Sequence, residues 1–150
     1  MTLASQSSDA LTLRSRLAVA VTLGFIAFLY FASLSGYIDF HPDEAIYFDG
    51  IPINISNDAG ILYHAVYGLA LKLHAGAQGA RMGSAWLGGL SLTLLLLFFT
   101  KYCRSPLQLL LIAATWLLSY QTIFVFDRVR PEALWWTLTA AMPLLMHRKR

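Results

Sequence analysis

The stretch that decides the fold is residues 82–100, MGSAWLGGLSLTLLLLFFT, which carries no charged side chain. An α-helix needs about 20 predominantly apolar residues to cross the hydrocarbon core of a bilayer. The stretch therefore predicts a membrane-spanning helix. Its first half is rich in small residues, which let helix backbones approach closely in lipid; they are Gly83, Ser84, Gly88, Gly89 and Ser91.

Three further apolar runs, 17–38, 106–126 and 133–147, predict three more spans. The 150-residue chain is 57% hydrophobic and only 13% charged, whereas about 25% of the residues of an average soluble domain are charged. We therefore expect an all-α membrane protein with four spans. A membrane domain over 17–150 would follow a cytoplasmic N-terminal segment, 1–16.

The first run has a second interpretation. Arg14 and Arg16 precede it, as basic residues precede the apolar core of a signal peptide. That core is usually about 7–15 residues long, and the run at 17–38 is longer. We therefore favour an uncleaved span over a signal peptide.

A polar, acidic outer loop is expected between the first two spans, over 39–81. Within it, residues 61–74 are apolar at helical spacing but too short to span. This pattern predicts a helix lying in the membrane interface.

The basic residues set the expected orientation, because cytoplasmic loops carry an excess of Lys and Arg. With the N-terminus inside, seven basic residues face the cytoplasm, and Lys72, Arg81, Arg128 and Arg130 remain outside. Both termini of this multi-pass protein of the inner or plasma membrane would be cytoplasmic. The basic residues do not form the single patch that nucleic acid binding needs, so no nucleic acid partner is expected. The lone Cys103 excludes an internal disulfide.

The first outer loop contains the sequence HPDEAIY, residues 41–47. The acidic pair Asp43 and Glu44 after Pro42 suits an ordinary helix start. The functional alternative is that one carboxylate is a general base toward an acceptor hydroxyl. His41 beside the pair is a weak metal signal, and we assign no metal site.

The second outer loop contains DRVRPE, residues 127–132. Arg128 and Arg130 would either pair with the neighbouring acids, which stabilises little at a surface, or hold a substrate phosphate in bidentate fashion. Trp135 and Trp136 follow, and we favour an interfacial aromatic belt over a sugar-stacking platform. None of the four runs has an ionisable group in its core, which argues against an ion-coupled transporter.

The order of these features resembles the start of the GT-C-type membrane glycosyltransferases, which include the protein O-mannosyltransferases and aminoarabinose-lipid A transferases. The resemblance rests on DEAIY at 43–47, the interfacial helix, ARMGSA at 80–85 and RPE at 130–132, and it covers about 17–146. The chain lacks the Pro-Pro pair that often precedes the interfacial helix in that family. Family members also have more spans, so the chain would correspond to an N-terminal portion.

The resemblance implies transfer of a sugar from a polyprenyl-phosphate donor to a lipid, glycan or protein hydroxyl at the outer membrane face. It implies Asp43 as the catalytic base with Glu44 as its neighbour, and substrate binding by Glu132 and Arg130 in the same site. We add Arg128 and Tyr47 as further candidate substrate-binding residues. Cationic groups or a divalent metal would stabilise the departing lipid phosphate. The expected partners are the lipid-linked donor and membrane lipids. The alternative is a non-catalytic subunit that packs against a partner membrane protein through Gly83, Ser84 and Gly88.

Overall fold

The computed structural model describes residues 13–35, 76–103, 105–126 and 131–147. These residues form helices and short connections, and no strand occurs in these ranges. The helices are α1 (Leu13–Ser35), α4 (Gly76–Phe99), α5 (Pro106–Leu117), α6 (Tyr120–Phe126) and α7 (Pro131–His147).

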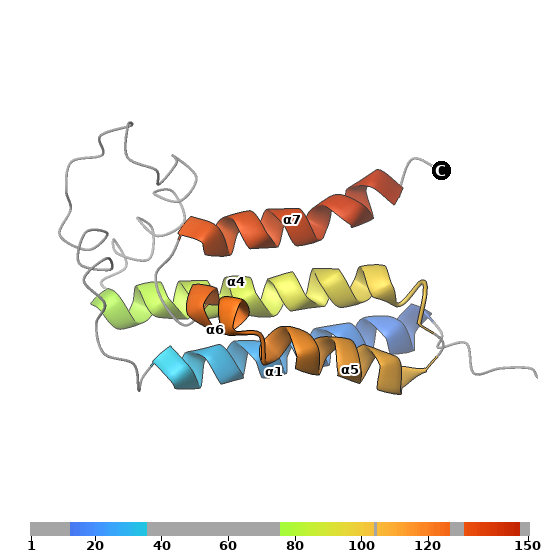
Figure 1. Ribbon diagram of the computed structural model, residues 1–150, viewed down its shortest axis with the longest axis horizontal. Coiled ribbons are helices and arrows are strands. Elements are labelled where there is room, and N and C mark those ends of the chain that lie inside the picture. Colours follow the sequence, from blue (N-terminus) through green and yellow to red (C-terminus); the bar gives the residue numbers. More distant parts are fainter. Residues whose placement is uncertain (1–12, 36–75, 104, 127–130, 148–150) are drawn as a thin grey trace, which may run out of the picture.

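Successive passes of the chain alternate in direction (Figure 1). We call one end of the bundle the basic end, because Arg14, Arg16 and Lys101 lie there. We call the other end the loop end, because the segments 36–75 and 127–130 attach to it (Figure 1). Its four attachment points are Ser35, Gly76, Phe126 and Pro131.

Two helices are long and apolar enough to cross a membrane, which marks the chain as a membrane protein. They lie at Arg14–Ser35 in α1 and at Gln78–Phe99 in α4. The first two predicted spans are thus confirmed as helices of sufficient length and composition. α4 begins at Gly76, so residues 76–81, expected in the outer loop, are helical.

The third predicted span is broken. Residues 106–126 form two helices, α5 and α6, with a bend of 68° between them. They are long enough for one span only when the pair is taken together. At the end of α5, the amide of Leu118 donates to the carbonyl of Ala114 at 2.9 Å, and that of Ser119 donates to Trp116 at 3.3 Å. The second of these is an i→i−3 bond, which tightens the last helical turn. No proline or glycine lies at this bend.

The fourth predicted span corresponds to α7, which has 17 residues and contains Pro143. A span usually needs about 20 residues, so α7 remains a predicted span only. It packs against α4. The hydroxyl of Thr137 lies 2.7 Å from the carbonyl oxygen of Ala133 in its own helix and 3.2 Å from that of Leu87 in α4.

The most extensive packing joins α1 to α4. Gly24 and Gly89 make the closest approach: a Cβ on Gly89 would lie 2.6 Å from the carbonyl oxygen of Gly24. Gly88, one residue earlier, is covered by the rings of Phe31 and Phe126. These two rings pack with Trp116 of α5, so an aromatic cluster fills the space above a glycine and fixes where α1, α4 and α6 meet.

Candidate functional site

Most of the predicted site residues lie outside the described part of the chain. This holds for Asp43, Glu44, Tyr47, Arg128 and Arg130. Glu132 is described, and it occupies the first turn of α7, directly after Pro131.

Glu132 lies at the loop end and is exposed. A carboxylate in a first helical turn interacts favourably with the positive end of the helix dipole, so Glu132 helps to start α7. Its exposure leaves it accessible to a substrate at the same end of the bundle.

Arg81 is the charged residue that sequence reasoning did not assign to the site. The sequence predicts it in the outer loop, but it lies in the second turn of α4 with only 6% of its surface exposed. Its Nη1 donates to the carbonyl oxygen of Ser35 at 2.9 Å. The last carbonyls of a helix have no partner within the helix, and a cation is favourable there. Arg81 therefore caps α1 and ties it to α4.

The distribution of charge distinguishes the two ends of the bundle. In the described ranges five residues carry a charge at neutral pH, namely Arg14, Arg16, Arg81, Lys101 and Glu132. Arg81 and Glu132 belong to the loop end, and the other three belong to the basic end. The segment 36–75, which contains the predicted base, is bounded by Ser35 and Gly76. The residues that flank 36–75 and those that flank 127–130 all lie at the loop end, which also holds Arg81 and Glu132 (Figure 1).

The two tryptophans predicted as an aromatic belt have different surroundings. Trp135 is 65% exposed, as a belt residue would be. Trp136 packs edge-on against Phe126 with ring centroids 6.2 Å apart, so it contributes to the contact between α7 and α6. The two tryptophans differ because α7 turns position 136 toward the bundle and position 135 away from it.

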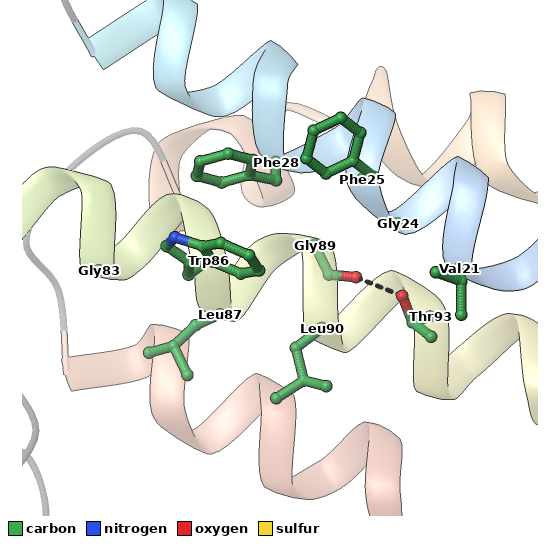
Figure 2. A pocket seen from close by; sticks show the side chains of 10 residues that line it. All are labelled: Val21, Gly24, Phe25, Phe28, Gly83, Trp86, Leu87, Gly89, Leu90 and Thr93. Carbon is green, nitrogen blue, oxygen red and sulfur yellow. Dashed lines mark hydrogen bonds between the residues drawn. The ribbon is translucent and has the colours of Figure 1, made fainter.

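An apolar groove of about 620 Å³ runs between α1 and α4 (Figure 2). Phe28 and Trp86 stack across it with ring centroids 4.5 Å apart. No ionisable residue lines the groove, so it offers apolar contact and no acid–base chemistry. Gly83 lines it, whereas Ser84 and Gly88 are buried within the chain.

A metal site is not formed by the described residues, because no three His, Cys, Asp or Glu side chains gather among them. Cys103 lies near the basic end, while Glu132 lies at the loop end.

Comparison with known proteins gives no match: no family model, no curated protein and no solved structure is similar to this chain. The likeness to GT-C-type enzymes therefore rests on the residues and on their order.

Proposed function

We propose that this chain is the N-terminal membrane part of a polyprenyl-phosphate-dependent glycosyltransferase, active at the outer face with both termini in the cytoplasm. The observation that supports the proposal best is the geometry of the loop end. The two segments that carry the candidate residues both begin and end there, beside the buried Arg81 and the exposed Glu132 (Figure 1).

The bundle supports such a site by joining the two helices that flank the segment of the candidate base. The hydrogen bond from Arg81 to Ser35 fixes the end of α1 against the start of α4. The segment 36–75 thus begins and ends on two helices that are locked together. The candidate base Asp43 therefore lies in a segment whose two flanking helices are joined by this bond.

The roles follow from the chemistry of glycosyl transfer. Asp43 takes the proton of the acceptor hydroxyl while the anomeric carbon gains oxocarbenium character. Arg128 and Arg130 hold the leaving polyprenyl phosphate, since a guanidinium binds phosphate oxygens in bidentate fashion. Glu132 and Tyr47 bind the sugar or the acceptor, and Glu44 adds negative charge beside the base.

The test is Asp43→Asn in the complete enzyme, assayed in membrane vesicles with a labelled polyprenyl-phosphate sugar. Loss of a general base usually lowers the rate by about 10²–10⁴-fold, and we expect a decrease of that size. Asp58→Asn is the matched control, because it removes an equal charge from the same segment. Transfer at the normal rate in Asp43→Asn would exclude the assigned base.

A second function is favoured by the groove between α1 and α4. The chain would then be a non-catalytic subunit, with a helix of a partner membrane protein packed over Trp86, which is 59% exposed. Gly83→Leu would fill the groove and is expected to abolish cross-linking to that partner, while Asp43→Asn would leave it intact. Gly88→Leu is less informative, since Gly88 is already covered within the chain.

A further inference from the structure

Thr122, in α6, differs from three other threonines of the described helices in the hydrogen bonding of its hydroxyl. Thr93, Thr115 and Thr137 each place the hydroxyl oxygen within 2.9 Å of the carbonyl oxygen four residues earlier. This bond satisfies a hydroxyl in an apolar environment. Thr122 is 1% exposed, and its Oγ1 has no hydrogen-bond partner in the part of the chain that the structure describes. A buried hydroxyl without a partner costs free energy.

The break in the third pass accounts for the missing bond. The residue four positions before Thr122 is Leu118, which forms the C-cap of α5. The chain bends by 68° between α5 and α6, so the carbonyl of Leu118 does not continue the ladder of α6. The bend therefore creates the unpaired hydroxyl, and a polar group from outside the helix is needed to satisfy it.

The same bend opens a cavity of about 490 Å³. Helix α6 packs against α4 and α7, and α5 packs against α4 and α1. The cavity is wide at the surface of the bundle, and no charged residue lines it. The lining residues that matter here are Leu95 of α4, Thr115 and Trp116 of α5, Ser119 at the bend, Thr122 of α6 and Trp136 of α7.

The lining of the cavity selects the class of ligand. No charged side chain among the described residues lines it, so the cavity holds no counter-charge for an ionised head group. Burying an ionised group without a counter-charge is costly. Bringing an uncharged hydroxyl into the cavity costs much less free energy. The indole rings of Trp116 and Trp136 offer flat apolar surfaces against which the hydrocarbon chain of such a lipid can pack.

We propose that this cavity binds an uncharged lipid with a free hydroxyl group, of the diacylglycerol or long-chain alcohol type, and that the lipid hydroxyl pairs with Oγ1 of Thr122. Thr122 itself lines the cavity, and its buried hydroxyl has no partner among the described residues. The inference goes beyond the proposed function and requires only that the bundle lies in a membrane.

The first experiment uses the full chain in phosphatidylcholine nanodiscs with a diazirine-bearing diacylglycerol. After irradiation, mass spectrometry is expected to locate the label in the peptides that contain Trp116 and Trp136. Unlabelled hexadecanol should compete with the probe, and a phosphatidic acid with the same chains should not. Labelling elsewhere, or equal competition by phosphatidic acid, would overturn the proposal.

The second experiment compares Thr122→Val with Thr115→Val. Both remove a hydroxyl from the lining, but that of Thr115 is already bonded to the carbonyl of Leu111 at 2.8 Å. We expect Thr122→Val to weaken diacylglycerol binding about three- to tenfold, the value of one ordinary hydrogen bond, and Thr115→Val to change it less than twofold.

Thermal unfolding separates this role from a purely structural one. Without lipid, Thr122→Val should unfold at a higher temperature than the wild type, because it removes an unpaired buried hydroxyl. Added diacylglycerol should raise the unfolding temperature of the wild type and of Thr115→Val more than that of Thr122→Val. An equal rise in unfolding temperature on adding diacylglycerol in all three proteins would contradict the proposal. Cross-linking of the cavity residues to a helix of a second copy would contradict it as well.

Discussion

Arg81 shows how one side chain joins two helices at the loop end. Its guanidinium is buried, and it donates to the last carbonyl of α1 from the second turn of α4. A hydrogen bond to a charged group contributes about 1.5–3 kcal/mol, and a cation near a helix C-terminus adds to this. The residue therefore stabilises the packing of α1 against α4 at the end where the proposed site lies.

Replacing Arg81 with methionine keeps an apolar stem but removes the donor. We expect the unfolding temperature in detergent to fall, with a loss of about 1.5–3 kcal/mol for the bond. Arg14→Gln, at the exposed start of α1, is the control and should have little effect. An unchanged unfolding temperature in Arg81→Met would mean that the bond does not stabilise the bundle.

Two charged residues expected in the outer loops lie in helices. Glu132, expected in the second outer loop, occupies the first turn of α7 directly after Pro131. Arg81, expected in the first outer loop, lies buried in α4. Its burial depends on the carbonyl of Ser35, 46 residues earlier in the chain, which no local pattern reveals.

At the scale of the elements, the contact between α1 and α4 depends on two glycines. A Cβ on Gly24 would lie 2.7 Å from the carbonyl oxygen of Gly89 and would also overlap the hydroxyl of Thr93. Thr93 has little freedom to move, because it donates to Gly89 at 2.9 Å (Figure 2). The two helices can approach this closely only because neither glycine carries a side chain.

Gly24→Val is therefore expected to destabilise the bundle by about 1–3 kcal/mol, the usual cost of overpacking. Chemical unfolding in mixed micelles measures this loss. Ala18→Val, at an exposed position of the same helix, is the matched control and should remain near the wild type. Similar stability of the two variants would show that the helices do not meet at Gly24.

Hydropathy predicts the positions of the elements but not the break in the third pass. The predicted boundaries, 106 and 126, agree with the start of α5 and the end of α6. The residues around the bend are WLLSY, 116–120, which contain neither proline nor glycine. The bend coincides with the packing of Trp116 against Phe31 and Phe126, and such tertiary contacts leave no periodic signal.

At the scale of the whole molecule, the two ends of the bundle differ in the charged residues that they carry. Arg14, Arg16 and Lys101 lie at the basic end, and the positive-inside rule predicts that this end faces the cytoplasm. The alternating direction of the helices places the loop end on the opposite side (Figure 1). Most of the candidate site lies outside the described residues, so the chemistry at the loop end remains a prediction from the sequence.

The orientation is open to a direct measurement, because Cys103 is the single cysteine of the chain. We expect a membrane-impermeant maleimide to label Cys103 only after the cells are permeabilised. In a Cys103→Ser background, Glu132→Cys should be labelled in intact cells, since Glu132 lies at the other end and is exposed. The reverse result would place the basic end outside.

The broken third pass also has a consequence for biogenesis. Helix α5 has 12 residues and α6 has 7, lengths of about 18 Å and 10 Å at 1.5 Å per residue. A hydrocarbon core is about 30 Å thick, so neither half partitions into lipid as an independent unit. We therefore expect the two halves to enter the bilayer together, as the single apolar segment 106–126, since only the pair is long enough to count as a span.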